Sequence, residues 1–279
     1  MSRLSLALDN TELAEHYEQI SAERQFKVGK QLAAALEIAP GEHVLDVGSG
    51  TGLLAGHVFD LVGPAGSVTG IDPLPLRIEI AKQRRNPAIR FEVGNAYDLS
   101  RFADASFDVV LLNAVFHWLP EKLEPLRQFA RVLAPGGRLG IATGSREHRN
   151  VLHTVKARVL ARAPFDRYPE GQDGVAHHIS AEELDALLKQ AGFVTKTIDV
   201  VANPHHFADG DAAVRFWEAS SFGNSIGHLP VSIRAAARKA IADELDALRT
   251  ADGIALGGAR IVAIATKPGA AARGVPRAG

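Results

Sequence analysis

A glycine-rich segment directly after a short apolar run constrains the fold of this chain more than any other feature. Residues 44–52 read Val-Leu-Asp-Val-Gly-Ser-Gly-Thr-Gly, and a helical apolar pattern begins at Leu53. Glycines let a backbone approach a ligand without a Cβ clash, and the amide groups that open a helix carry partial positive charge. This order of strand, loop and helix predicts a binding site for an anionic or carboxylate-bearing group.

The spacing of the glycines distinguishes between two kinds of cofactor loop. A dinucleotide loop of the form G-x-G-x-x-G would have its third glycine at position 53, which is Leu53. The chain instead has G-x-G-x-G, with glycines at 48, 50 and 52. None of its three tyrosines is followed by a lysine four residues on. Both observations argue against an NAD-dependent oxidoreductase.

Short apolar segments alternate with helical patterns through the first half of the chain. Strands are predicted at residues 43–47, 67–71, 89–93, 107–112 and 138–143. Helices are expected after Gly52, before the Asn86-Pro87 stop and over residues 121–133, where the Pro135-Gly136-Gly137 turn follows. This alternation favours an α/β fold with a doubly wound parallel sheet.

The second half divides into segments of different composition. We expect a helical segment over the active site at 1–40, a core at 41–143, a lid at 144–179 and the rest of the sheet at 180–267. Within the last part, strands are predicted at 193–201 and 260–266, and 203–250 forms a helical insertion for the substrate. Ser180 and Glu183 predict a capping box. Residues 268–279 are expected to be a disordered tail.

Composition excludes several functional classes. The 31 Lys and Arg against 32 Asp and Glu give a net charge of −1, which disfavours a nucleic-acid partner. The absence of cysteine removes disulfides and Cys-ligated zinc, and no HExxH pattern occurs, so no metal is expected. No signal peptide or membrane-length apolar run is present, so we expect a cytoplasmic protein without a membrane partner.

Four further segments follow the glycine loop in a fixed order. They are Gly70-Ile71-Asp72, Val93-Gly94-Asn95-Ala96, the run from Leu112 to Trp118, and Arg131 to Gly137. Together these segments resemble the motifs of class I S-adenosylmethionine-dependent methyltransferases. The resemblance implies a Rossmann-like, doubly wound, seven-stranded sheet with one antiparallel strand and a helical cap or lid. The segment from Phe207 to Lys267 is loosely similar to the trans-aconitate and malonyl-carrier carboxyl methyltransferase group.

The resemblance also implies a cofactor, S-adenosyl-L-methionine, which leaves as S-adenosyl-L-homocysteine, and a set of residues that bind it. The methionine part would lie against Asp46 and the loop, Asp72 would bind the ribose, and Asn95 with the Ala96 amide would meet the adenine. Asn95 departs from the aspartate that many relatives carry, but its oxygen is still an acceptor. The full set is Asp46, Gly48, Ser49, Gly50, Gly52, Asp72, Pro73, Asn95, Ala96, Asn113 and Ala114.

The implied activity is methyl transfer to a small-molecule acceptor. Positioning alone can accomplish much of this chemistry, but a hydroxyl, amine or acidic carbon benefits from a base, for which His117 is the candidate. The alternative is that His117 and Trp118 only pack against the ligand. Further candidates for acceptor contact are Tyr17, Arg24, His178 and Trp217.

Histidines and arginines gather in the expected lid, at 146–153 and 177–178, and at the start of the expected insertion, at 205–206. Such a cluster can receive a carboxylate or phenolate, although a solvated surface is the simpler interpretation. O-methylation is favoured over N- or C-methylation, and a SAM-binding enzyme that does not methylate remains an alternative. The Asn/Asp-Pro-Pro-Tyr/Phe motif of nucleic-acid methyltransferases is absent at Asn113. The sequence leaves the oligomeric state open.

Overall fold

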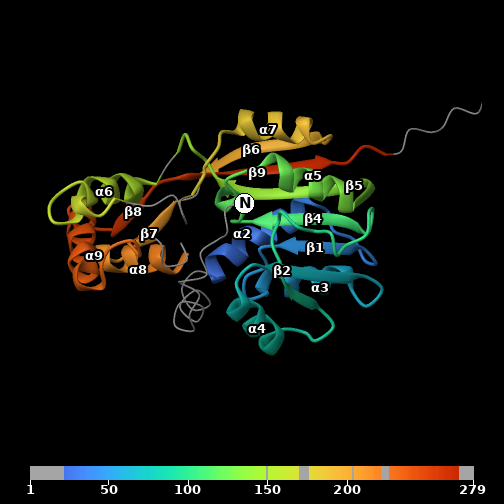
Figure 1. The fold of residues 1–279 in the computed structure, drawn as a ribbon, viewed down its shortest axis with the longest axis horizontal. Coiled ribbons are helices and arrows are strands. Elements are labelled where there is room, and N and C mark those ends of the chain that lie inside the picture. The colour runs from blue at the N-terminus through green and yellow to red at the C-terminus, as the bar shows by residue number, and fades with distance from the viewer. Residues whose placement is uncertain (1–21, 149, 170–175, 203, 221–225, 270–279) are drawn as a thin grey trace, which may run out of the picture.

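A computed structural model describes residues 22–148, 150–169, 176–202, 204–220 and 226–269, with only the backbone of 22–24 and 219–220. These residues form a layered α/β core and a smaller helical cap, side by side in Figure 1. The core elements of the first half are α2 (Ala22–Ala35), β1 (His43–Val47), α3 (Leu53–Val62), β2 (Ser67–Asp72), α4 (Pro75–Arg84), β3 (Arg90–Val93), β4 (Phe107–Asn113), the 3₁₀ turn η3 (Phe116–Trp118), α5 (Leu123–Val132) and β5 (Leu133–Gly144).

The second half of the chain supplies the cap and completes the sheet. Its elements are α6 (Val151–Leu160), η4 (Phe165–Arg167), α7 (Ala181–Gln190), β6 (Val194–Ala202), β7 (His205–Phe207), α8 (Gly210–Ser220), α9 (Val231–Asp246), β8 (Ile254–Leu256) and β9 (Ala259–Thr266). The capping box predicted at Ser180 and Glu183 is present at the start of α7.

The central sheet has seven strands in the order β3-β2-β1-β4-β5-β9-β6. Strand β9 runs antiparallel to the other six strands of this sheet, which confirms the expected fold class. The strand order reverses between β1 and β4, and ligands of open α/β sheets bind beyond the carboxyl ends of strands at such a reversal. The topology therefore directs attention to the end of β1, where the glycine loop lies.

Two apolar clusters cover the two faces of the sheet. One packs Leu126 of α5 and Leu184 of α7 against the strands, and the other packs Leu32 of α2, Leu54 of α3 and Ile78 of α4. Side chains in both clusters are buried, so the strands are held from both sides. This double cover fixes the strand ends that carry the functional loops.

The cap has an apolar cluster of its own. Side chains from α6, α8 and α9 pack with those of β7 and β8, and the cluster includes Val155, Val214 and Ile241. The lid expected at 144–179 thus contains a helix, α6, that sequence patterning did not identify. The sheet β7–β8 was also missed, because three-residue strands are too short to show alternation.

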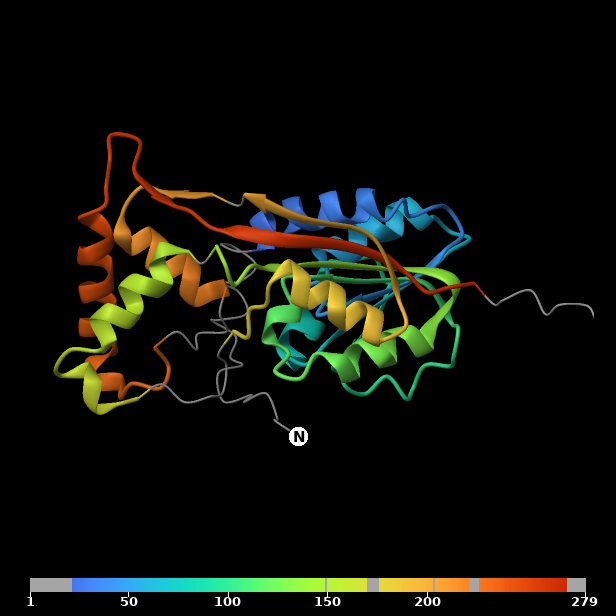
Figure 2. The same ribbon diagram turned by 90° about the horizontal axis from the view of Figure 1, so that it is seen from above.

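A two-stranded ribbon joins the core to the cap. In the large sheet Ala202 is paired with Ala259, and in the small sheet His205 is paired with Leu256. Figure 2 shows β6 and β9 running on into the cap along one edge of the molecule. Strand β5 differs from its prediction, because it begins at Leu133 and accommodates the Gly136-Gly137 turn at a register shift against β4.

Candidate active site

The glycine loop after β1 is held in shape by the end of β2. Gly48, Gly50 and Gly52 have φ angles of 75°, 56° and 81°, which favour glycine over other residues. The amide of Gly50 donates to Asp72 Oδ2 at 3.0 Å, and the amide of Leu74 donates to Asp72 Oδ1 at 3.0 Å. The buried Asp72 carboxylate therefore fastens the loop to β2. A carboxylate oxygen can accept more than one hydrogen bond, so these two bonds are compatible with a further donor.

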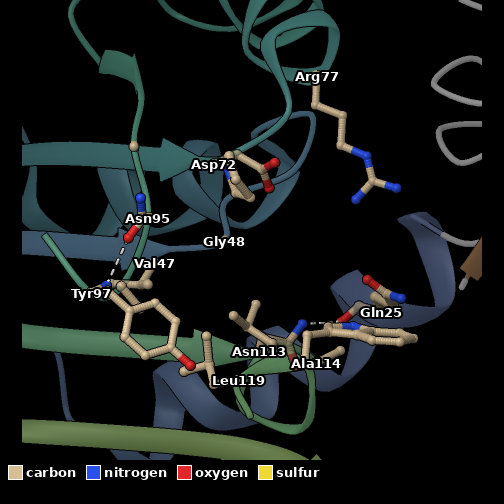
Figure 3. A pocket seen from close by; sticks show the side chains of 15 residues that line it. Gln25, Val47, Gly48, Asp72, Arg77, Asn95, Tyr97, Asn113, Ala114 and Leu119 are labelled. Atoms are coloured by element: carbon tan, nitrogen blue, oxygen red, sulfur yellow. Dashed lines mark hydrogen bonds between the residues drawn. The ribbon is translucent and has the colours of Figure 1, made fainter. Parts of the chain in front are cut away.

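A pocket at the ends of the strands, here called the strand-end pocket, is shown in Figure 3. Eight residues predicted for ligand binding line it: Gly48, Asp72, Pro73, Asn95, Ala96, Asn113, Ala114 and Trp118. In Figure 3 Asp72 and Arg77 lie across the pocket from Asn113 and Gln25. Asn95 Oδ1 accepts a hydrogen bond from the Tyr97 amide at 2.9 Å. Sequence motifs from four separate segments thus converge on one pocket.

A smaller pocket, the loop pocket, lies between the glycine loop and α2. Its lining includes Asp46, Ser49 and Asn113. Asp46 Oδ2, Ser49 Oγ and Asn113 Oδ1 are buried and have no hydrogen-bond partner among the described residues. Burial, and after it the charge of the nearby Asp72, raises the pKa of Asp46 to about 7. Three buried acceptors without donors are costly, so the pocket suits a cationic group that donates several hydrogen bonds.

The large cavity, of about 650 Å³, lies between the ends of β4 and β5, helix α2 and the cap. His117, Trp118, His178 and Trp217 line it, as does His153 of α6. Its volume is in the range of pockets that enclose drug-sized ligands. Gln25, Asn113, Ala114 and Trp118 line both this cavity and the strand-end pocket. The two spaces therefore adjoin at these four residues.

His117 is half-buried at the wall of the large cavity. Its Nδ1 lies 3.1 Å from Thr143 Oγ1, and its ring stacks on His178 with centroids 5.3 Å apart. His153 meets the edge of the His178 ring at 5.9 Å. Burial, followed by the positive charge of His178, Lys122 and His153, lowers the pKa of His117 well below 6.5. The His117 imidazole is therefore neutral at pH 7 and able to accept a proton.

Lys122 positions the turn that carries His117. Its buried ammonium donates to Phe116 O at 3.0 Å and to Leu119 O at 2.7 Å. These carbonyls lie at the beginning and just past the end of η3, so one cation satisfies both. Burial lowers the pKa of Lys122 to about 8.

Several predicted residues lie elsewhere. Tyr17 lies outside the described residues, and so does the side chain of Arg24. Gly50 and Gly52 shape the loop but do not line the three spaces. An added Cβ at Gly52 would lie 2.6 Å from the Phe91 ring, so a glycine is needed for the loop to pack on β3. Of the predicted cationic cluster, His153, His178, His205 and His206 line the large cavity, whereas Arg146 pairs with Glu183 at 2.8 Å.

Sequence reasoning missed several residues of the site. Lys27 and Gln31 of α2, Thr143 of β5 and Arg260 of β9 line the large cavity, and Arg77 of α4 lines the strand-end pocket. The spacing of Gln25, Val28 and Gln31 on one helical face was a usable signal for α2. No pattern in the sequence marks Arg260, whose place depends on the pairing of β9.

Two absences apply to the described part of the chain. It contains no cluster of three or more His, Asp or Glu side chains arranged to hold a metal ion. None of its helices combines the length and the apolar character needed to span a membrane.

Comparison with known proteins identifies the family. Residues 45–141 match the family model described as a methyltransferase domain. The demethylmenaquinone methyltransferase of Lactobacillus johnsonii is 30% identical over 202 residues, which make up 66% of this chain and 82% of that protein. The chain belongs to the class I S-adenosylmethionine-dependent methyltransferase superfamily. S-Adenosyl-L-methionine is the cofactor of this superfamily.

Other relatives differ more in length or in sequence. The O-methyltransferase cnsE of Penicillium expansum is 36% identical over 180 residues, covering 62% of this chain and 59% of that protein. The chain spans between 49% and 66% of the length of the first three curated relatives. The solved YcgJ protein of Bacillus subtilis shares the fold, with a TM-score of 0.58 at 18% identity, over 86% of this chain and 97% of that one.

The two smaller pockets fit this cofactor. The loop pocket offers three unpartnered acceptor oxygens, which suit the ammonium of a methionine. The strand-end pocket adjoins it at Gln25, Gly48 and Asn113, and holds the Asp72 carboxylate where two ribose hydroxyls can donate. The residues present therefore match both the charged end and the nucleoside end of the cofactor.

Proposed function

We propose that this protein transfers a methyl group from S-adenosyl-L-methionine to a small-molecule acceptor. The observation that carries the proposal is that the strand-end pocket and the large cavity adjoin, because Gln25, Asn113, Ala114 and Trp118 line both. A nucleoside-sized ligand in the pocket and an acceptor in the cavity would meet at these residues. Methyl transfer needs this adjacency, because the reacting atoms must be in line and close.

We assign the cofactor to the two pockets on the loop side. The bound cofactor supplies a methyl group already activated on a sulfonium. Asp46, Ser49 and Asn113 hold the ammonium, and Asp72 holds the ribose. Pro73, Asn95 and Ala96 meet the adenine, Asn95 through the second lone pair of an oxygen that already accepts from Tyr97.

We assign the acceptor to the large cavity, with His117 as its general base. When the Nδ1–H of His117 donates to Thr143 Oγ1, the lone pair on Nε2 is available for a proton from the acceptor. A neutral imidazole is the form that this role requires, and the low pKa of His117 provides it at pH 7. A hydroxyl that loses its proton to Nε2 becomes a better nucleophile, which favours O-methylation over N- or C-methylation.

Two measurements test the proposal. Calorimetry should show one S-adenosyl-L-homocysteine bound per chain at micromolar dissociation constant, a range typical of such ligands. A screen of small hydroxy compounds with isotope-labelled donor, read by mass spectrometry, should yield a methylated product. Binding of S-adenosyl-L-homocysteine without methylation of any acceptor would favour a SAM-binding enzyme that does not methylate. Tight binding of NADH in place of S-adenosyl-L-homocysteine would refute the assignment.

A further inference from the structure

The three spaces of the site meet at two residues. Gln25 of α2 and Asn113 at the end of β4 line the strand-end pocket, the loop pocket and the large cavity, and no other described residue lines all three. The sulfur of S-adenosyl-L-methionine likewise bears three arms, which are the amino-acid chain, the nucleoside and the methyl group. With the assignments proposed above, each arm has one of these spaces, and the sulfur falls at their junction beside Asn113.

Asn113 ends β4 at a sharp turn. The next residue, Ala114, has a φ of 59°, a left-handed conformation that a residue with a side chain adopts only at a cost in free energy. The amide of Ala114 donates to Ala142 O of β5 at 2.8 Å, which holds the turn in place. The strand therefore stops at Asn113, and its side chain lies at the carboxyl end of the sheet.

The orientation of the Asn113 amide is fixed by helix α2. Its Nδ2 donates to Gln25 O at 2.9 Å, the hydrogen bond drawn between these residues in Figure 3. A backbone carbonyl can only accept, so the amide cannot turn to present Oδ1 to it. Helix α2 comes this near because an added Cβ at Gly29 would lie 2.7 Å from Leu54 Cδ2 and 3.1 Å from Asn113 Nδ2. Asn113 Oδ1 is thus held on the side away from Gln25 O.

Asn113 Oδ1 is suited to a positively charged ligand group. It is buried and has no hydrogen-bond partner among the described residues. Such an acceptor is unfavourable unless a ligand supplies a partner, and a carbonyl oxygen is the negative end of its dipole. The oxygen has two lone pairs, so the bond proposed above to the ammonium leaves one for a second positive group. The junction therefore offers an oriented acceptor where the sulfur is placed.

We propose that Asn113 Oδ1 recognises the positive charge of the sulfonium and so makes the protein bind the methyl donor more tightly than the product. The sulfur is cationic in S-adenosyl-L-methionine and neutral in S-adenosyl-L-homocysteine, so only the donor benefits from this oxygen. The product then competes weakly with fresh donor. This inference rests on the proposed function for the identity of the cofactor and its place in the pockets. It adds the residue that distinguishes donor from product.

The test uses two probes that differ only at the position of the sulfonium, S-adenosyl-L-homocysteine and sinefungin. Sinefungin carries there a carbon with an amine, which is protonated near neutral pH. Calorimetry on the wild-type protein should give at least about tenfold tighter binding of sinefungin, since the cation donates to a buried acceptor. Both probes present the same amino-acid and nucleoside ends, whose contributions cancel in the ratio. Equal affinities, or tighter binding of S-adenosyl-L-homocysteine, would overturn the inference.

Variants locate the charge recognition. Asn113→Leu should reduce the preference for sinefungin to about twofold, whereas Asn113→Asp should retain at least about tenfold. Both variants lose the bond to Gln25 O, so the difference between them reports on the acceptor oxygen. Ser49→Ala is the matched control, because Ser49 lines the loop pocket and neither of the other two spaces. It should weaken both probes alike. A preference that survives Asn113→Leu, or falls equally in Ser49→Ala, would contradict the assignment to Asn113.

Failure of the inference and failure of the proposed function give different results. The titration with S-adenosyl-L-homocysteine alone reports on the proposed function. If this compound binds and sinefungin binds no more tightly, the site does not select for charge at the sulfonium position and only the inference is wrong. If neither compound binds, the proposed function is wrong and the inference is refuted with it.

Discussion

The core and the cap hold their functional groups in different ways. In the core, the backbone carries the site: the loop adopts positive φ angles at Gly48, Gly50 and Gly52, and amides fasten it to Asp72. In the cap, side chains carry the site, and His153, Phe216 and Trp217 reach the large cavity from helices that pack on a separate apolar cluster. In the proposed function, the loop backbone shapes the site of a cofactor common to the superfamily, whereas side chains of the cap line the site assigned to the acceptor, so acceptor choice is expected to vary with the cap.

The largest effect is expected from a substitution in the glycine loop of the core. Gly48→Ala would bring its Cβ to 2.2 Å from Val115 Cγ2, at a φ of 75°. We expect the affinity for S-adenosyl-L-homocysteine, measured by calorimetry, to fall by more than about 100-fold. Gly41→Ala is the control, because its φ is 88° but no atom lies within 4 Å of the added Cβ. Equal affinities of the two variants would contradict the prediction that the shape of the glycine loop controls cofactor binding.

The second prediction concerns proton removal. His117→Gln should lower kcat by about 100-fold for a hydroxyl acceptor, since that is a typical contribution of a general base. A base works in its neutral form, so wild-type kcat should fall only when the pH drops below the lowered pKa of His117. The pH profile should therefore be flat down to pH 6.5. A fall in kcat at saturating cofactor already above pH 6.5, or an unchanged kcat in the variant, would leave His117 a packing role.

The third prediction separates the cap from the core. Trp217→Ala should raise the acceptor KM by about tenfold, while the affinity for S-adenosyl-L-homocysteine changes by no more than about twofold. The separation follows from the position of Trp217, which lines the large cavity and neither of the other two pockets. If the variant lost cofactor affinity and kept its acceptor KM, the division between core and cap would be wrong.

The fourth prediction uses the protonation of Asp46. Its pKa of about 7 means that roughly a tenth of the protein carries the ionised carboxylate at pH 6 and most of it at pH 8. A cationic ammonium binds the ionised form, so the affinity for S-adenosyl-L-homocysteine should rise by about tenfold between these values. Asp46→Asn should weaken binding at pH 8 and remove this pH dependence. A variant with the wild-type pH profile would assign the titration to another group.

The last prediction is that removal of metal ions has no effect on turnover. Treatment with EDTA should leave turnover unchanged, because an activated sulfonium needs no Lewis acid and the sequence contains no recognised ligand motif. Turnover that is lost on chelation and restored by magnesium or zinc would contradict this prediction. It would direct attention to the histidines of the large cavity.

The sequence predicted the core better than the cap, for a physical reason. The glycine loop, Asp72 and Asn95 follow strands in short motifs, because the backbone there admits few residue types. Arg260 and Gln31 form one hydrogen bond but lie 229 residues apart in the chain. No local pattern records such a pair, since it exists only after β9 has joined the sheet.

Other parts of the site fall between these cases. His178 and Trp217 are predicted as acceptor contacts, and both line the large cavity. The partner of His117 in the stack could not be foreseen, since it depends on the space that Gly144 leaves. The position of Lys122 beneath η3 was likewise invisible in sequence, because a lysine in a polar stretch is normally exposed.

The ribbon that joins core and cap bears on how such proteins diversify. The segment between Ala202 and Ala259 leaves and rejoins the sheet at a single backbone pair, so its two ends are already together however long it becomes. The entropic cost of closing a longer excursion rises only with the logarithm of its length. A chimera that replaces this segment with the corresponding one of another superfamily member therefore has to match one register of the sheet and the apolar face of α6 that packs on α8 and α9. Exchange of whole segments at this junction gives evolution and engineering a route to new acceptors that leaves the cofactor loop untouched.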